Sequence, residues 1–198
     1  MTNTKKVNSR GRPRTFDVDE AVGKAQALFH QRGYDAVSLA DLTGALAINP
    51  PSFYAAFGSK ADLYGRALER YAKTEGLDFD RLLAPERPLN EALAALFDAA
   101  AVAYTAHPEA TGCLVIEGAR GGTDAVACDK AKTLWRRSRQ VVRDAIADRA
   151  ADRADEITDY VMAILAGLSA SARDGLGAAR LRAIGRTASL AFMSDKAR

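Results

Sequence analysis

The stretch from residue 38 to residue 60 constrains the fold more than any other part of the chain, because it contains three helix-start signals in close succession. Ser38 and Ser59 are each followed three residues later by an aspartate, a pattern that caps the amino terminus of a helix. Asn49 can cap the helix between them, and Pro50 suits its first position because an N–H there would have no helical partner. Short helices joined by a tight turn predict a helix-turn-helix, a motif whose second helix enters the DNA major groove.

Periodic apolar residues predict further helices on both sides of this motif. From Val18 they recur on one helical face, and Gly33 is suited to end that helix. Phe53 and Phe57 stand four residues apart, so both can anchor the second helix of the motif to a core. The next helix is expected to run to about Tyr71. The first part of the chain therefore predicts a small helical domain.

Positive charge gathers at the amino-terminal end. The net charge is +3, and the first 76 residues hold 11 basic and 8 acidic residues, which accounts for the whole excess. Five of these cations precede residue 15, with no acid among them. A basic segment beside a helix-turn-helix is expected to bind DNA phosphates, and a solvated terminus without that role is the alternative.

Composition and motifs argue against several other classes of protein. Apolar residues make up 48% and charged residues 27%, values typical of a folded globular chain. The sequence shows no apolar run that could span a membrane and no secretory signal, and two cysteines cannot form a disulfide framework for this length, so a cytoplasmic protein is expected. It also lacks a serine-hydrolase elbow, a phosphate loop and a zinc-protease motif, so we expect no enzyme, no cofactor and no metal site.

The rest of the chain also follows helical periodicity. A stripe of apolar residues covers 89–104, and a long amphipathic helix is expected over 124–149. Between them lie the apolar segment 113–116 and the glycine-rich segment 118–122, which we expect to form a loop. Two further apolar stripes end the chain. The pattern predicts an all-α fold.

Two segments of the first domain resemble the TetR family of bacterial transcriptional regulators: Tyr34-Asp-Ala-Val-Ser-Leu-Ala-Asp-Leu42 and Ile48-Asn-Pro-Pro-Ser-Phe-Tyr-Ala-Ala-Phe-Gly-Ser-Lys60. The resemblance extends from about Phe16 to Tyr71, and Arg10-Gly-Arg-Pro-Arg14 is a common opening of such proteins. The chain departs from the family pattern at the turn, where Ala47 replaces a frequent glycine. It departs again before the last aromatic residue, where Ala56 replaces a usual histidine.

The resemblance implies an all-α protein with a basic flexible arm at 1–15, a three-helix helix-turn-helix DNA-binding domain at 16–60, and a helical effector-binding and dimerisation domain at 61–198. It also implies a sequence-specific DNA-binding regulator, by default a repressor. Such a protein binds a double-stranded DNA operator as a homodimer and leaves it when a small-molecule or reactive effector binds. The alternative is a DNA-binding protein controlled by a protein partner or by cysteine oxidation, without a small-molecule pocket.

The expected DNA contacts come from the arm, from helix starts and from the second helix of the motif. Ser38 and Lys60 are implied to hold phosphates, since the free N–H groups and the dipole of a helix amino terminus favour an anion. Simple capping is the alternative role of Ser38. Tyr54 is implied to contact a phosphate or a base edge, with packing beside Phe53 as its alternative. The complete expected set is Arg10, Arg12, Arg14, Ser38, Asn49, Pro50, Ser52, Tyr54 and Lys60.

An effector would insert between helices of the second domain. The candidate lining residues are mostly apolar or aromatic, so a plain core role is their alternative: Phe97, Tyr104, Cys113, Ile116, Trp135 and Met162, with Phe79, Leu96 and Ala100 beside them. Cys113 follows Gly112 in a segment resembling a glycine–cysteine motif of some such regulators, and it could sense oxidants or electrophiles if its pKa were lowered. A metal site with His107 and Cys128 matches no tight zinc spacing.

The last two helices offer more apolar surface than one short domain needs, which favours a four-helix contact across a two-fold axis. The expected dimer residues are Tyr160, Val161, Ile164, Leu165, Leu168, Leu181, Ile184 and Ala188. The family resemblance implies the same arrangement. An intrachain core is the alternative.

Overall fold

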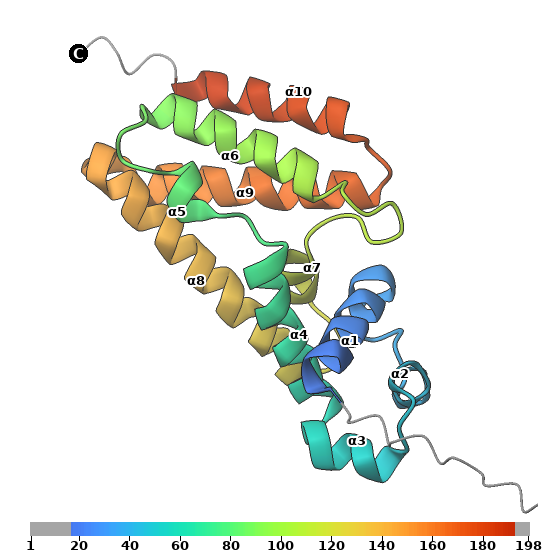
Figure 1. The fold of residues 1–198 in the computed structure, drawn as a ribbon. Coiled ribbons are helices and arrows are strands. Elements are labelled where there is room, and N and C mark those ends of the chain that lie inside the picture. The colour runs from blue at the N-terminus through green and yellow to red at the C-terminus, as the bar shows by residue number, and fades with distance from the viewer. Residues whose placement is uncertain (1–16, 193–198) are drawn as a thin grey trace, which may run out of the picture.

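The computed structural model describes residues 17–192, and the regular secondary structure of that range is helical, as predicted. Figure 1 shows α1, α2 and α3 at one end of the molecule and α6, α9 and α10 at the other. We call α1–α4 the head and α5–α10 the body. The helices are α1 (Val18–Arg32), α2 (Leu39–Leu46), α3 (Pro50–Phe57), α4 (Lys60–Thr74), α5 (Phe79–Leu82), α6 (Leu89–Ala103), α7 (Leu114–Arg120), α8 (Ala125–Ala150), α9 (Ala154–Arg173) and α10 (Ala178–Ser189), with a short 3-10 helix (Ala151–Arg153) before α9.

The three helix starts predicted in the head are present, because a side chain caps each of them. Ser38 and Asp41 form a reciprocal capping box at α2. At α3 the carboxamide oxygen of Asn49 accepts a hydrogen bond from the N–H of Ser52 at 2.9 Å. Ser59 caps α4 in the same way. These short-range bonds fix where each helix begins.

A hydrophobic core holds the head together and continues into the body. Phe29, Leu42, Phe53 and Tyr64 come from four different helices and are almost completely buried. The same cluster includes residues of α7 and α8, namely Leu114, Val115, Ala127 and Ala131. Helix α4 begins at the domain boundary expected near residue 60 and contributes to this core along its length. It therefore packs as part of the head and connects the head to the body.

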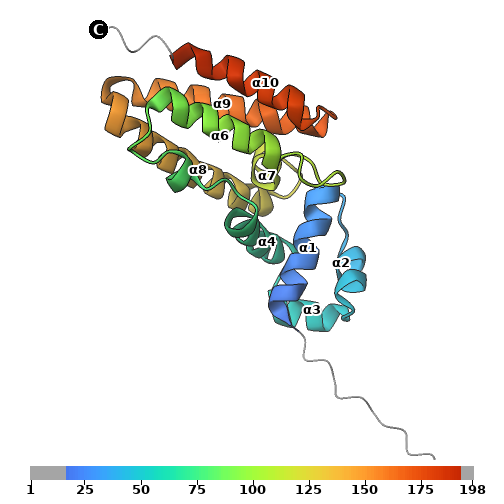
Figure 2. The same cartoon turned by 45° about the horizontal axis from the view of Figure 1, so that its top comes forward.

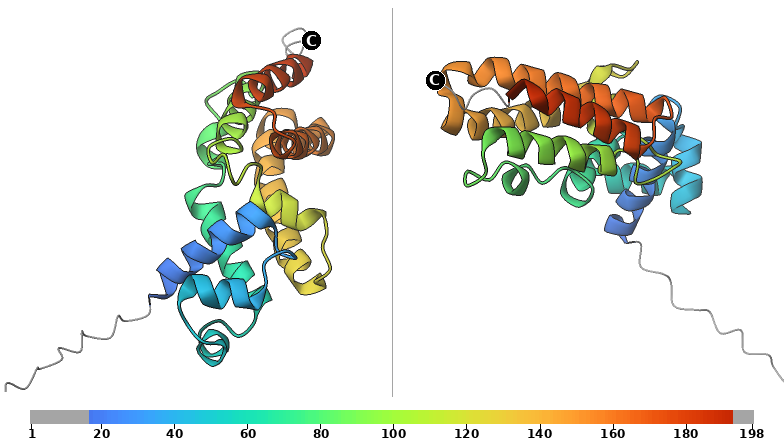
Figure 3. Two further views of the ribbon diagram at one scale, coloured as in Figure 1. Left: turned by 90° about the vertical axis from the view of Figure 1, so that its right-hand side faces the viewer. Right: turned by 90° about the horizontal axis from the view of Figure 1, so that it is seen from above.

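The body is a bundle in which α6 packs against both α9 and α10, and α9 also packs against α8. Figure 3 shows α8 extending from this bundle toward the head. The contact between α6 and α10 is close, because a Cβ on Gly185 would lie 2.8 Å from the Cβ of Phe97. Among residues 17–192, no helix combines the length and the apolar character needed to cross a lipid bilayer.

Helix α7 stands where the sequence predicted an apolar segment followed by a glycine-rich loop. Gly118 lies inside this helix, and the connection to α8 begins only at Gly121. A Cβ on Gly118 would collide with the hydroxyl of Tyr64. The loop prediction was wrong here because this glycine serves close packing of α7 on α4 rather than a turn.

The residues expected to line an effector pocket are brought together, and they form part of the core. Phe97, Tyr104, Ile116 and Met162 are buried in the body. The other two, Cys113 and Trp135, are half-buried and pack against the cores of both the head and the body. The two hollows described below are lined by other residues. An effector at this place would have to separate packed side chains, so the pocket stays a prediction.

The apolar stripes of α9 and α10 are mostly used inside the chain. Five of the expected dimer residues are buried in the body core: Val161, Leu165, Leu168, Leu181 and Ala188. Helix α10 packs on α6 and α9, and α9 packs also on α8, so these five side chains are covered within the chain and the dimer contact stays a prediction. Tyr160, Ile164 and Ile184 keep accessible surface, and Ile184 is 40% exposed.

Candidate nucleic-acid interface

Helix α3 stands at the end of the molecule opposite to α9 and α10 (Figures 1 and 2). Phe53 and Phe57 face inward and are buried, which ties the helix to the head core. Its amino terminus carries Asn49 as the cap and Pro50 in the first turn. The helix therefore presents its other side to solvent, as a recognition helix must.

The outward side of α3 and its cap hold the residues predicted to face the DNA groove. Asn49, Pro50, Ser52 and Tyr54 are all exposed, Tyr54 with 53% of its surface accessible. The Tyr54 ring also meets Phe53 edge-on, with 5.6 Å between the ring centroids. Packing and exposure therefore coexist at Tyr54, because the ring is supported on one side while much of the side chain stays accessible.

The turn between α2 and α3 contains one strained residue. Ala47 has φ 54° and ψ 42°, and within residues 17–192 it alone among non-glycine residues has a positive φ. The N–H of Ala47 donates to the carbonyl of Gly44 at 3.2 Å, and the N–H of Ile48 donates to that of Thr43 at 3.1 Å. Left-handed backbone costs an L-residue roughly 1–2 kcal/mol. The chain thus forms the tight turn that positions α3 with a strained alanine, at a position where glycine would have no steric strain.

The amino terminus of α2 is a polar corner held by three side chains. The Ser38 hydroxyl accepts from the N–H of Asp41 at 3.1 Å and donates to the Asp41 carboxylate at 2.5 Å. Arg32, at the end of α1, donates to the same carboxylate at 3.0 Å. The hydrogen bonds from Ser38, followed by the Arg32 guanidinium, lower the pKa of Asp41 below its usual range. Ser38 therefore caps α2 and is also exposed, so its phosphate contact stays a prediction beside the capping role.

Lys60, the first residue of α4, packs against Tyr34. Its Nζ lies 4.0 Å from the centroid of the Tyr34 ring, and its side chain is half-buried. Burial lowers the pKa of Lys60, while the charges of Asp35 and Asp124 act in the opposite direction. The phosphate contact of Lys60 therefore stays a prediction beside its packing on Tyr34. The arm residues Arg10, Arg12 and Arg14 lie outside the described residues, so their contacts also stay predictions.

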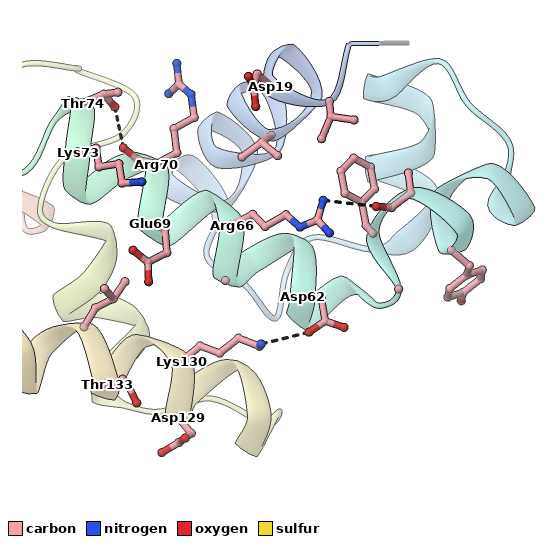
Figure 4. Close-up of a pocket in the computed structure, with 18 of the residues that line it drawn as sticks. Asp19, Asp62, Arg66, Glu69, Arg70, Lys73, Thr74, Asp129, Lys130 and Thr133 are labelled. Carbon is pink, nitrogen blue, oxygen red and sulfur yellow. Dashed lines mark hydrogen bonds and ion pairs between the residues drawn. The ribbon is translucent and has the colours of Figure 1, made fainter.

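A groove of about 1160 Å³ lies between α4 and α8 and extends to α3 (Figure 4). Charged residues of both signs line it. Lys130 of α8 pairs with Asp62 of α4 at 3.1 Å, and Arg137 of α8 pairs with Glu69 of α4 at 3.1 Å. Exposed pairs of this kind contribute little individually to stability. They nevertheless neutralise two of the cations in the groove and connect α8 to the head, so this surface differs from the uniformly basic surfaces that bind phosphates.

Sequence reasoning missed the contacts that attach the head to the body. His30 of α1 donates from Nε2 to the carbonyl of Gly112 at 3.1 Å, and Arg173 of α9 donates to the carbonyl of His30 at 2.9 Å. The hydroxyl of Tyr34 donates to the carboxylate of Asp124 at 2.6 Å. These partners lie 82, 143 and 90 residues apart in the chain. No local pattern could indicate such pairs.

Comparison with known proteins agrees with this geometry. The family model described as "Bacterial regulatory proteins, tetR family" matches residues 22–67, which extend from α1 into α4. The HTH-type transcriptional repressor BdcR of Escherichia coli (strain K12) is 40% identical over 175 residues, 88% of each chain. The HTH-type transcriptional repressor ComR of the same organism is 33% identical over 196 residues, 90% of each chain.

Solved structures give the same result. A cysteine mutant of the TetR family transcriptional regulator CifR, complexed with a 26-base-pair double-strand operator DNA, matches with a TM-score of 0.82 and 34% identity, covering 91% of this chain and 100% of that one. The reduced form of E. coli NemR matches with a TM-score of 0.70 at 17% identity, over 86% of this chain and 94% of that one, which is a likeness of fold alone. On the extent and identity of these matches, the chain belongs to the TetR family of bacterial regulatory proteins.

Proposed function

We propose that the protein is a transcriptional repressor that binds its operator as a homodimer in the bacterial cytoplasm and is released from it by an effector. The observation that carries the proposal is the exposed side of α3, which is anchored by buried phenylalanines and presents Pro50, Ser52 and Tyr54 to solvent beside its exposed cap, Asn49. The relatives named as HTH-type repressors and the operator complex of CifR support the same function.

The DNA contacts divide into two kinds. Residues at helix amino termini, with the basic arm, bind phosphates and fix the position of the head on the duplex. The exposed side of α3 lies in the major groove and contacts base edges. This side carries no long charged side chain, so apolar contacts and DNA shape supply a large share of the sequence preference.

A mobility-shift titration tests the proposal directly. The probe is DNA flanking the protein's own gene, because such regulators often control adjacent transcription units, and the titration is repeated at several salt concentrations. Affinity is expected to fall steeply with salt because phosphate binding releases counterions. Removing residues 1–14 should reduce both affinity and salt slope, whereas Arg136→Gln, which removes an exposed cation from α8, should change neither. Absence of binding to any such fragment in dilute buffer would refute the proposal.

The dimer contact uses the outer sides of α9 and α10. Ile184 of α10 is 40% exposed and Leu190, the residue after that helix, is 58% exposed. Tyr160 and Ile164 of α9 are half-buried. Small residues with accessible surface alternate with these apolar ones, namely Ala163, Gly167, Ala183 and Ala191. Apolar and small side chains on two neighbouring helices suit the close, self-complementary packing of an isologous contact.

A small molecule that enters between the head core and the body core is the favoured effector. Trp135 packs against both cores and is the single tryptophan of the chain, so its fluorescence should respond to such a ligand. Ligands that release operator DNA should change this emission in the same concentration range. A compound that releases DNA without changing the Trp135 fluorescence binds outside the junction of the two cores.

Modification of Cys113 is a second candidate for the release signal. This cysteine packs against both the head core and the body core, where the two meet. Burial raises the pKa of the Cys113 thiol, which opposes formation of the reactive thiolate and favours the small-molecule route. If N-ethylmaleimide releases the operator from the parent protein and from Cys128→Ser but not from Cys113→Ser, the thiol is the signal.

A further inference from the structure

The turn after α1 and the segment before α8 meet in a compact set of polar contacts. The Tyr34 hydroxyl donates to the carboxylate of Asp124 at 2.6 Å. The carboxylate of Asp35 accepts from the Thr123 hydroxyl at 2.7 Å and from the Thr123 N–H at 3.0 Å. We propose that these four residues, which we call the hinge clamp, set the angle between head and body and thereby determine which half-site spacing the dimer accepts.

Both sides of the hinge clamp are themselves held firmly. The Tyr34 ring lies 5.8 Å from the ring of Phe29 and 4.9 Å from that of Tyr64, centroid to centroid, so it is anchored in the head core. Asp124 caps α8 by accepting from the N–H groups of Val126 at 2.9 Å and Ala127 at 3.1 Å. A bond between two such fixed groups transmits the orientation of α8 to the head rather than merely joining two loose loops.

Hydrogen bonds add to the packing that holds the head on the body at this place. A hollow of about 340 Å³ adjoins the contact and is lined in part by Tyr34, Asp35, Gly121 and Gly122. The backbone also approaches closely, because a Cβ on Gly122 would lie 3.0 Å from the Asp35 carboxylate. Apolar contacts between head and body continue at Ala127 and Ala131 of α8, and the clamp adds directional bonds to that packing.

The position of the hinge clamp connects it to the DNA surface. Asp35 lies three residues before Ser38, the cap of α2, and Lys60 at the start of α4 packs on the Tyr34 ring. A change at the clamp therefore moves the amino terminus of α2 and the start of α4 together. In the proposed dimer, which this inference presupposes, such a movement changes the separation of the two recognition helices. Operators with half-sites one helical turn apart depend on that separation.

The experiment compares operators that differ only in spacing. The probes are the operator located by footprinting and two versions with one base pair inserted or deleted between the half-sites. The parent protein should prefer the natural spacing. Tyr34→Phe combined with Thr123→Val removes both hydroxyl donors with little change of shape, and it should reduce that preference several-fold. Thr123→Ser alone keeps the hydroxyl and should retain the parent preference.

A matched control separates positioning from general stability. Thr105→Val removes a hydroxyl that donates to the carbonyl of Ala101 within the body, and it should leave the spacing preference unchanged. If the double variant loses affinity for all three spacings in equal proportion, or keeps the parent preference, the hinge clamp does not set the spacing. Failure of the parent protein to bind any operator as a dimer would instead refute the proposed function, so the two failures are distinguishable.

Discussion

His30 and Gly112 join the first helix of the head to the loop that precedes α7, with the histidine Nε2 3.1 Å from the glycine carbonyl. The histidine ring is buried, lies edge-on to Tyr71 at 5.1 Å between centroids, and has the Arg173 guanidinium beside it. The same loop leads directly to Cys113, the residue before α7. The contact therefore connects the head to the place where the head core and the body core meet.

Burial lowers the pKa of His30, so the protein should lose stability on mild acidification. The unfolded chain takes up a proton near the ordinary histidine pKa of about 6.5, whereas the buried ring stays neutral. The contribution of His30 to the free energy of unfolding is therefore complete above the ordinary histidine pKa. It decreases as the pH falls from there toward the lowered pKa of the folded protein. The free energy of unfolding should therefore fall between pH 7 and 5.5, by at most about 1.4 kcal/mol per pH unit from this group. Urea denaturation at several pH values measures it.

His107 supplies the matched control for this prediction, because its side chain is exposed. His30→Gln should flatten the dependence of stability on pH between 7 and 5.5, while His107→Gln should leave it largely as in the parent. Equal slopes for His30→Gln and the parent protein would mean that another group titrates in this range.

Ala47→Gly should stabilise the head, because glycine adopts the observed φ of 54° without steric cost. The free energy gained by removing the left-handed strain exceeds the free-energy cost of the greater conformational entropy of glycine in the unfolded chain. The free energy of unfolding should therefore rise by about 0.5–1 kcal/mol. Ala45→Gly is the control, since Ala45 is exposed within α2 and has helical backbone, where glycine destabilises. Chemical denaturation measures both, and a loss of stability in Ala47→Gly would contradict the strain argument.

Local sequence signals predicted the head well because the head is built from local bonds. Ser38, Asn49 and Ser59 each cap a helix within three residues of their own position, and the period of Phe53 and Phe57 reports directly which side of α3 is buried. Such features depend on neighbours along the chain. They are independent of how the body folds.

The body was harder to predict because glycines and apolar stripes there are each compatible with two structures. Gly118 suggested a loop, yet it lies inside α7 where the Tyr64 hydroxyl leaves no room for a side chain. An apolar stripe on α10 suggested a dimer surface, yet Leu181 is buried within one chain because α10 packs on α6 and α9. Periodicity shows that a helix side is covered. It does not show whether the cover comes from the same chain or from a second copy.

Tyr54→Phe should weaken operator binding while leaving stability almost unchanged. The side chain is 53% exposed and its ring contact with Phe53 does not involve the hydroxyl, so removing that oxygen costs the folded protein little. On DNA the hydroxyl is expected to bind a phosphate or a base edge, a contact worth about 1 kcal/mol or a several-fold change in affinity. Mobility shift and thermal denaturation should be measured on the same preparations. Equal loss of stability and binding would make Tyr54 a structural residue.

Ile184→Glu should dissociate the dimer and weaken operator binding without unfolding the subunit. Ile184 is 40% exposed on α10, so a carboxylate there is tolerated in a single chain but would be desolvated in an apolar contact between two copies. Val126→Glu is the matched control, because Val126 is 59% exposed near the start of α8, away from α9 and α10 along the chain. Sedimentation analysis should show a monomer for Ile184→Glu at concentrations where the parent and Val126→Glu are dimers. Operator affinity should fall in parallel, since a lone head loses the second half-site. If Ile184→Glu stays dimeric with unchanged affinity, the outer side of α10 is not the contact.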